Sequence, residues 1–174
     1  MSSAAKQQPA IPPSRILATF DDGLVVRTYE GAYRDEFRRL NVAWLTRYFR
    51  VEPIDERVLG DPEGEILAPG GEILFATLDG VVVGTVALKP ETSGAFELTK
   101  MAVDEPHQGK GYGKRLLEAA CTLARERGAQ RVMLYSQRGL RAAVSMYRKY
   151  GFNELPLSDP RYSRCDVKME RVLS

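Results

Sequence analysis

The chain has 174 residues, 44% of them hydrophobic, which is the usual size and composition of one globular domain with a single core. Its 25 basic residues nearly balance its 23 acidic ones, so the net charge of +2 argues against a nucleic-acid-binding surface. No apolar stretch approaches the ~20 residues of a membrane span, and the N-terminal segment lacks the apolar centre of a signal peptide. We therefore expect a cytoplasmic protein that binds neither nucleic acid nor a membrane.

Cysteine and histidine usage narrows the chemistry further. Cys121 and Cys165 do not form a CxxC motif, so we expect two reduced thiols rather than a disulfide scaffold or a zinc site. His107 is the only histidine, which excludes a site that needs two imidazoles and leaves a serine triad only one candidate base. We expect no metal.

The N-terminal third combines a lead-in with one strand and one helix. Residues 1–17 are rich in Pro, Ser, Ala and Gln, so we expect them to be flexible and residues 18–174 to form the domain. A short strand is predicted at 24–28. A helix is predicted over residues 33–49, because one face collects side chains at helical spacing: Phe37, Leu40, Asn41, Trp44, Leu45 and Tyr48.

The rest of the chain alternates strands and helices. Residues 51–71 are rich in Pro, Gly and acidic residues and predict a long connection with one helical turn. Two β-rich runs joined by Asp79-Gly80 then predict a hairpin. Further strands are expected at 95–103, 131–136, 152–157 and 163–172, and helices at 114–127 and 140–150. This order predicts an α/β fold with a mixed sheet.

The segment "QGKGYGK" at residues 108–114 lies between a predicted strand and a predicted helix. Glycines allow successive backbone N–H groups to point into one concavity at a helix N-terminus, and such a nest binds phosphate. The alternative is a glycine-rich turn with solvated lysines. The spacing is not that of a P-loop, because Lys114 is followed by Arg115, and it is not the GxGxxG of a dinucleotide-binding fold.

The same segment matches the Q/R-x-x-G-x-G/A signature of the GNAT superfamily of N-acetyltransferases, with Gln108, Gly111 and Gly113 in the defined places. The flanking runs "FELTKMAV", "KRLLEAACTLARERG", "VMLYS" and "AAVSMYRKYGF" resemble the rest of that family's core in order and spacing. More narrowly, "FRRLNVAWL", "GGEILFA" and "YSRCDVKME" resemble stand-alone or MarR-fused bacterial acetyltransferases.

This resemblance implies a splayed, GNAT-like sheet that receives acetyl-CoA between the strands at 95–103 and 131–136. It implies a set of residues that bind the pantetheine arm and the pyrophosphate: Met101, Ala102, Val103, Gln108, Gly109, Lys110, Gly111, Tyr112, Gly113 and Lys114. Gln137 stands where relatives often carry asparagine, and a contact between Gln137 and the donor is also expected.

Two catalytic residues are implied for transfer of acetyl from acetyl-CoA to a primary amine by direct attack. Tyr147 occupies the place of the family's tyrosine acid, which protonates the departing thiolate; the alternative is a core aromatic side chain. Glu97 aligns with the strand glutamate that serves histone-type relatives as base. Strand alternation places Glu97 on one face with Thr99 and Met101. Its alternatives are an edge-strand carboxylate in a salt bridge, or deprotonation of the amine by ordered water.

The acceptor is expected to be a small-molecule or amino-acid-like amine. The acidic run over residues 52–65 would attract a protonated amine if it is not merely a solvated loop. Arg164, near Tyr162, could meet a carboxylate on an amino-acid-like acceptor. Two further functions stay open, acetylation of protein N-termini or lysines and non-catalytic sensing of acyl-CoA, and a homodimer is neither required nor excluded.

Overall fold

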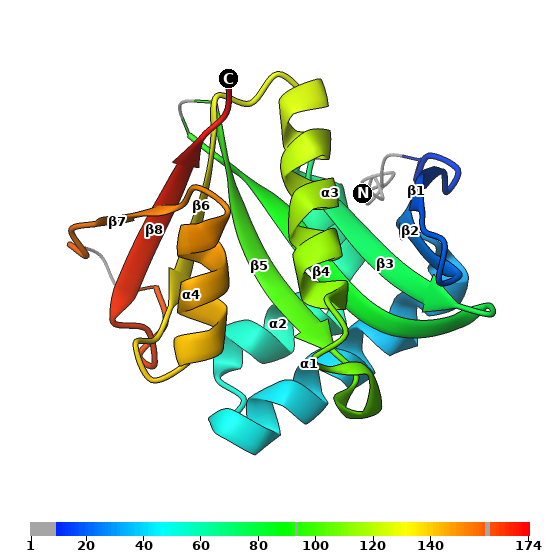
Figure 1. The fold of residues 1–174 in the computed structure, drawn as a ribbon, viewed down its shortest axis with the longest axis horizontal. Helices are drawn as coiled ribbons and strands as arrows, with labels where there is room; N and C mark the ends of the chain where they lie inside the picture. The colour runs from blue at the N-terminus through cyan, green and yellow to red at the C-terminus, as the bar shows by residue number, and fades with distance from the viewer. Residues whose placement is uncertain (1–9, 93, 159–160) are drawn as a thin grey trace, which may run out of the picture.

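The computed structural model describes residues 10–92, 94–158 and 161–174, and these build one mixed sheet with helices on both faces (Figure 1). The strand order is β1-β2-β3-β4-β5-β6-β8-β7. The strands are β1 (Ile16–Thr19), β2 (Leu24–Thr28), β3 (Glu72–Leu78), β4 (Val81–Glu91), β5 (Ala95–Val103), β6 (Arg131–Ser136), β7 (Asn153–Leu155) and β8 (Val167–Val172). The helices are α1 (Arg34–Tyr48), α2 (Pro53–Gly60), α3 (Tyr112–Glu126) and α4 (Arg141–Lys149), with short turns η1 (Gly31–Tyr33), η2 (Glu63–Leu67) and η3 (Glu105–His107).

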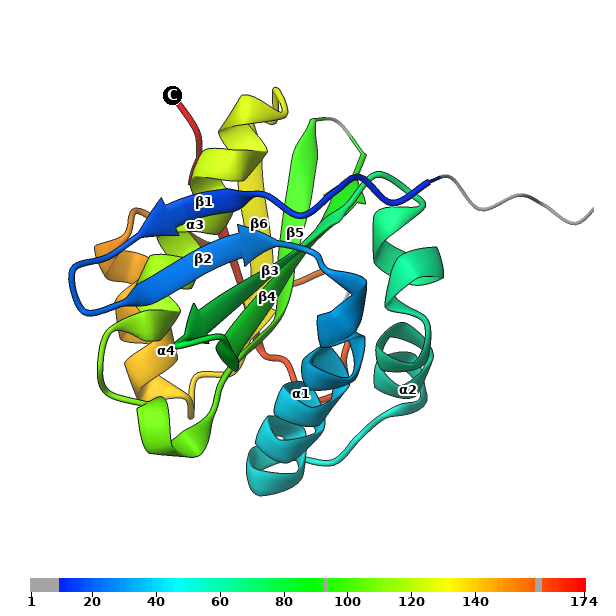
Figure 2. The same cartoon turned by 90° about the vertical axis from the view of Figure 1, so that its right-hand side faces the viewer.

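The sheet separates two hydrophobic cores. Figure 2 shows α3 and α4 on one side of the sheet and α1 and α2 on the other. The core under α3 and α4 contains Leu74, Leu116 and Phe152, and the core under α1 and α2 contains Phe37 and Phe75. Successive side chains of a strand point to opposite faces of the sheet, so β3 contributes side chains to both cores. The predicted α/β architecture with a mixed sheet is confirmed.

The hairpin of β3 and β4 is confirmed at its predicted turn. Asp79 and Gly80 both have positive φ, +50° and +77°, as the two-residue turn favoured by the twist of antiparallel strands requires. The predicted helices are also found, with α3 beginning at Tyr112, two residues before the expected start. The turn expected between 54 and 59 is a full α2, which Pro53 opens and a Glu52–Asp55 capping box stabilises.

The boundary of the lead-in differs from the prediction. β1 begins at Ile16 and pairs antiparallel with β2, so the sheet already includes residues 16 and 17. The Ser14 hydroxyl donates a hydrogen bond to the Thr28 carbonyl oxygen at 2.8 Å, and the Arg15 N–H donates to the Thr28 hydroxyl at 2.9 Å. This strand was difficult to predict because it is only four residues long and follows Pro12 and Pro13 closely. Residues 1–9 lie outside the described part. In residues 10–92, 94–158 and 161–174, no helix is long and apolar enough to cross a membrane.

A β-bulge in the middle of β5 shapes the functional end of the sheet. Between the pairs Ala87–Thr99 and Thr85–Ala102, two residues of β5 lie opposite one residue of β4. Lys100, one of these two, has a φ of +53°, which is rare for a residue other than glycine. The bulge reverses the alternation: Phe96 and Leu98 before it pack on the α3–α4 core, and Met101, the second bulge residue, packs on the same core. The expectation that Glu97 shares a face with Met101 is therefore wrong.

Candidate active site

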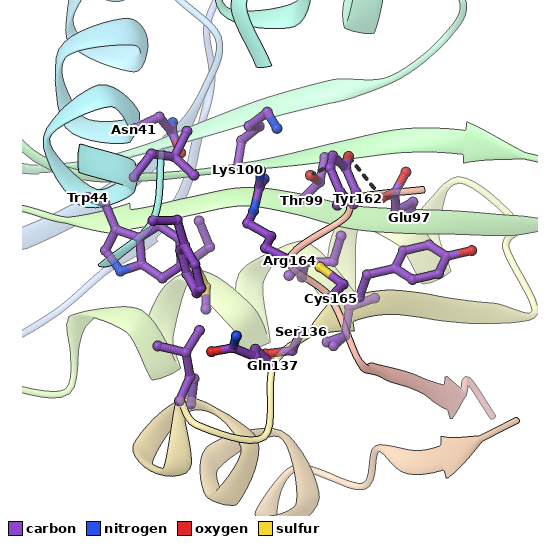
Figure 3. Close-up of a pocket in the computed structure, with 18 of the residues that line it drawn as sticks. Asn41, Trp44, Glu97, Thr99, Lys100, Ser136, Gln137, Tyr162, Arg164 and Cys165 are labelled. Atoms are coloured by element: carbon purple, nitrogen blue, oxygen red, sulfur yellow. Dashed lines mark hydrogen bonds between the residues drawn. The ribbon is translucent and has the colours of Figure 1, made fainter. Parts of the chain in front are cut away.

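The candidate site lies where β5 and β6 part. These parallel neighbours pair only from Ala95 to Glu97 on β5 and from Arg131 to Met133 on β6. Beyond those pairs the strands diverge on either side of a pocket, which is lined from both faces of the sheet. Figure 3 shows the labelled side chains converging from α1, from β5, from the end of β6 and from the segment before β8. The splay expected between these two strands is confirmed.

The glycine segment forms a concave turn at the N-terminus of α3. Gly109 and Gly111 have φ of +79° and +82°, and Gly111 is the N-cap of the helix. Arg115 is the first residue whose N–H bonds back into this helix, to the Gly111 carbonyl oxygen at 3.2 Å. The N–H groups of Tyr112, Gly113 and Lys114 therefore have no intrahelical acceptor, and they point in the direction that attracts an anion.

The side chains of this segment have different surroundings. The Gln108 amide donates a hydrogen bond to the Val103 carbonyl oxygen at 3.0 Å, which ties the turn to β5. Lys110 is exposed. Tyr112 is buried, as is Ala102 on β5, so only the backbone of these two residues could contact a ligand. Arg115, directly after the turn, makes an ion pair with Asp22, in which its Nη1 donates to both carboxylate oxygens at 2.9 and 2.7 Å.

Tyr147 is at once a core residue and a pocket residue. It is 8% exposed, its ring packs against Phe152 with centroids 5.9 Å apart, and it lines the pocket with Met101 and Gln137. Its hydroxyl makes no hydrogen bond to any described residue. Burial raises the pKa of Tyr147 to about 12, so the phenol stays protonated at neutral pH. A proton donor is thus held at the pocket wall.

Glu97 lines the same pocket from the opposite face of β5. Its side chain is 1% exposed, and it accepts hydrogen bonds from Arg161 at 3.0 Å and from the Tyr162 hydroxyl at 3.4 Å. Burial raises the pKa of Glu97, against the opposing attraction of Arg161 and Lys89. Glu97 is therefore a buried carboxylate that does form a salt bridge, with Arg161, as its alternative supposed, but it lies on an interior strand and not on an edge strand.

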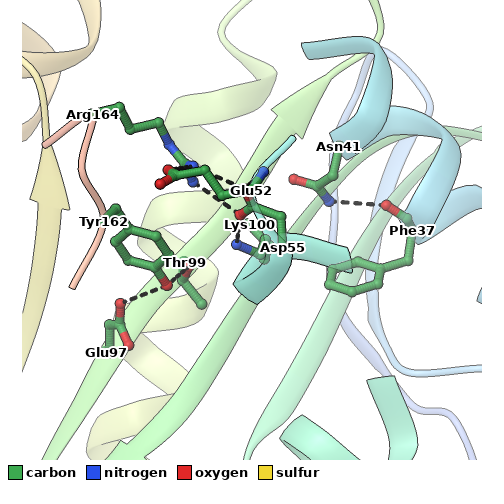
Figure 4. Close-up of polar contacts among 9 residues, drawn as sticks. All are labelled: Phe37, Asn41, Glu52, Asp55, Glu97, Thr99, Lys100, Tyr162 and Arg164. Carbon is green, nitrogen blue, oxygen red and sulfur yellow. Dashed lines mark hydrogen bonds and ion pairs between the residues drawn. The ribbon is translucent and has the colours of Figure 1, made fainter. Parts of the chain in front are cut away.

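The acidic run at 52–65 does not form a free anionic lip. Asp55 is fully buried and accepts hydrogen bonds from Lys100 at 2.7 Å and from Arg164 at 2.8 and 3.0 Å (Figure 4). Glu52 pairs with the same guanidinium at 2.6 Å. The remaining acids that form ion pairs, Glu56, Glu63 and Glu65, are paired with Arg38, Arg34 and Arg57. The expectation that this run attracts an amine fails because most of its carboxylates already have cationic partners.

The buried Asp55 makes acid sensitivity testable. Burial alone would raise the pKa of Asp55, but hydrogen bonds from Arg164 and Lys100 outweigh burial and lower the pKa to about 2. A depressed carboxylate pKa stabilises the fold at pH above the unfolded value near 3.8, and this contribution is lost as pH falls toward 2. We expect roughly 2 kcal/mol of the unfolding free energy to disappear over that range.

Urea denaturation at pH values from 7 to 2 measures this contribution. Asp55→Asn should lower stability at neutral pH and flatten the pH dependence below 4. Glu56→Gln, which removes a neighbouring carboxylate from an exposed ion pair, is the matched control and should retain the wild-type profile. If Asp55→Asn lost stability below pH 4 just as the wild type does, the pairing of Asp55 with Lys100 and Arg164 would be contradicted.

The structure brings some of the expected site residues together and leaves others apart. Glu97, Met101, Gln137 and Tyr147 line one pocket. Val103 and the turn from Gln108 to Lys114 follow at the end of β5. Sequence reasoning missed the role of Lys100 and left Asp55 without partners. Regular strand periodicity does not predict that Lys100 points into the pocket. The pairing of Asp55 with Arg164 could not be predicted because the two residues are 109 positions apart in the sequence.

Comparisons with known proteins agree with this geometry. The family model described as "Acetyltransferase (GNAT) family" matches residues 20–152. The chain belongs to the GNAT acetyltransferase family. A GNAT-family acetyltransferase from Staphylococcus aureus superposes with a TM-score of 0.77 at 23% identity, covering 87% of this chain and 99% of that one. The PaiA N-acetyltransferase from Thermoplasma acidophilum, solved in complex with coenzyme A, superposes with a TM-score of 0.66 at 20% identity. This match covers 86% of this chain and 99% of that one.

Curated relatives of this GNAT chain are longer proteins. A mycothiol acetyltransferase from Nocardia farcinica is 33% identical over an alignment of 144 positions, and the match covers 75% of this chain and 46% of that protein. The human N-acetylaspartate synthetase is 35% identical over 92 residues, which are 52% of this chain and 30% of that protein. The chain thus spans less than half the length of these two relatives.

Proposed function

We propose that this GNAT protein transfers an acetyl group from acetyl-CoA to a primary amine of a small, amino-acid-like molecule by direct attack. The observation that carries the proposal is the phosphate-type nest at the start of α3, next to the opening between β5 and β6 that Tyr147 lines. The nest suits a pyrophosphate, and the parted strand β5 offers backbone groups to an extended pantetheine arm.

The residues around the opening have distinct roles in this proposal. N–H groups from Gly109 to Lys114 bind the pyrophosphate, and the backbone of Met101 to Val103 binds the pantetheine and polarises the thioester carbonyl. The thioester supplies the activated acyl group. The amine attacks its carbonyl carbon, loses a proton toward Glu97 directly or through water, and the sulfur departs with the proton of Tyr147. The side-chain amide of Gln137 contacts the donor at the same wall.

Titration calorimetry with acetyl-CoA, followed by a coenzyme A release assay against amino acids, polyamines, amines and peptides, tests the function. We expect tight binding and release with small amines. Binding without release for any acceptor would favour an acyl-CoA sensor. Release with peptides alone would favour a protein acetyltransferase.

The role of Glu97 predicts a pH-dependent defect. A base must be ionised, and burial raises the pKa of Glu97 above its ordinary value of 4.5, so wild-type kcat should fall as pH drops through that raised value. Glu97→Gln should lower kcat about tenfold near neutral pH, less than the 10² of a dedicated base because water can also accept the proton. The defect should shrink at high pH, where the free amine arrives already deprotonated.

Steady-state pH profiles of both enzymes measure this effect. Glu91→Gln is the matched control, because Glu91 also pairs with Arg161 but does not line the pocket. If the Glu97→Gln profile runs parallel to the wild type at every pH, Glu97 is not the base.

A further inference from the structure

We infer that the acceptor of this enzyme carries a carboxylate as well as its reacting amine, and that Lys100 and Arg164 form the carboxylate subsite. The inference rests on the proposed N-acetyltransferase function and names the substrate class. It starts from two cations that lie side by side at the acceptor end of the pocket. Both line the pocket, and their side chains are only 4% and 15% exposed.

A single carboxylate oxygen fixes the two cations next to each other. Asp55 Oδ1 accepts from Lys100 Nζ at 2.7 Å and from Arg164 Nη2 at 3.0 Å. Both cations also lie over the ring of Tyr162, at 5.1 and 4.8 Å from its centroid. If either cation moved into solvent, the buried carboxylate of Asp55 would lose one of its two cationic partners, so both cations are held in position before any ligand binds.

Each cation retains donors beyond those that its protein partners use. An ammonium group has three N–H donors, and Lys100 spends one of them on Asp55. A guanidinium has five, and Arg164 bonds to Glu52 and Asp55 through Nη1 and Nη2, while its Nε bonds to no described residue. Carboxylate oxygens are the acceptors that such adjacent donors bind best.

The backbone supports the same assignment. Lys100 occupies a left-handed conformation that costs a non-glycine residue about 1–2 kcal/mol. The bulge that imposes this conformation consists of Lys100 and Met101 and directly follows Thr99, and all three residues line the pocket. A lysine buried at that point is a polar exception to the apolar pattern of β5, and burial lowers its pKa while Asp55 opposes the change.

The charges of the pocket match a dipolar acceptor. The Tyr162 hydroxyl points to Glu97, which also pairs with Arg161, while its ring faces Lys100 and Arg164, which pair with Asp55 and Glu52 (Figure 4). A carboxylate group and two cationic groups therefore lie on different sides of Tyr162. An amine with a carboxylate brings one charge to each side. A simple amine would bring no acceptor for the donors that Lys100 and Arg164 leave unused. Trp44, Leu45 and Phe49 of the adjoining wall favour an apolar side chain.

The test compares matched acceptors on the wild-type enzyme. Phenylalanine, leucine and methionine are each assayed beside their amides and beside the corresponding amine that lacks the carboxylate, with acetyl-CoA saturating. We expect kcat/KM to be at least about tenfold higher for the carboxylate member of the preferred set, mostly through KM, as loss of a charged hydrogen bond predicts. Equal or better turnover of the uncharged analogues would overturn the carboxylate subsite and leave the acetyltransferase function standing.

Two substitutions of Arg164 and one control test whether this residue causes the preference for a carboxylate. Arg164→Gln should erase the advantage of the carboxylate, and Arg164→Lys should restore part of it. Arg38→Gln, which removes an exposed partner of Glu56 outside the pocket, should keep it. Persistence of the full preference in a folded Arg164→Gln protein would also overturn the assignment.

A binding readout separates failure of the subsite from failure of the proposed function. Trp44 is the only tryptophan and lines the pocket, so its fluorescence reports occupancy without turnover. N-acetyl amino acids should change this signal at concentrations at least about tenfold lower than their N-acetyl amides do. This response without catalysis would support the subsite and reject the enzyme, whereas no difference between acids and amides would reject the subsite.

Discussion

Replacing Gly111 by valine is expected to weaken acetyl-CoA binding by about 100-fold or more. Gly111 has a φ of +82° at the N-cap of α3, where a side chain would meet open space, so the obstacle is conformational rather than steric. Valine can relieve the strain only by rotating the backbone, and that rotation turns the N–H groups of the nest away from a common point. Loss of two charged hydrogen bonds accounts for a change of this size.

The opposite end of the same helix provides a matched control. Gly128 also has a φ of +82° and open space around it, but it follows the C-terminus of α3, far from the nest. Gly128→Val should therefore cost a similar 1–2 kcal/mol or so of stability and leave binding intact. Titration calorimetry measures affinity and thermal unfolding measures strain. If both variants bind acetyl-CoA equally well, the pyrophosphate does not lie in this turn.

Replacing Tyr147 by phenylalanine is expected to lower kcat about 10²-fold, the usual scale for loss of a general acid. The substitution removes only the hydroxyl, so the packing against Phe152 and the affinity for acetyl-CoA should persist. With its pKa near 12, the phenol remains protonated throughout the assay range, so ionisation of Tyr147 should not limit wild-type turnover below about pH 11.

Steady-state kinetics and direct binding together separate the two roles of this side chain. Tyr33→Phe removes a hydroxyl from a ring that packs on Phe75 in the other core and does not line the pocket, so it should have wild-type kinetics. Wild-type kcat in Tyr147→Phe would leave Tyr147 with a packing role alone.

Local patterns predicted most of the fold. The hairpin at Asp79-Gly80, the amphipathic helix α3 and the glycine turn that precedes it depend on neighbours within a few residues, and each lies where periodicity and turn chemistry placed it. β1 was not predicted because its four residues are too few to show an alternating pattern. Its pairing with β2 decides its structure.

The charged part of the site could not be predicted in this way. Residues 52–65 resemble an acidic surface because most of their cationic partners lie elsewhere in the chain, on α1, on β5 and ahead of β8. The position of Glu97 relative to Met101 was wrong for a different reason. Side chains alternate between the faces of a sheet only while the strand is regular. No sequence pattern around Lys100 predicts the β-bulge that interrupts β5.

The bulge at Lys100 also bears on the order of events in catalysis. The bulge places Lys100 on the same side of β5 as Glu97, facing α1 and α2, whereas the nest and Tyr147 belong to the α3–α4 side of the sheet. If donor and acceptor bind as proposed, they approach the pocket from opposite faces of the sheet. Neither must then leave before the other binds. Both can therefore be present when the bond forms, which suits a ternary complex and gives the protein no reason to store the acetyl group on itself.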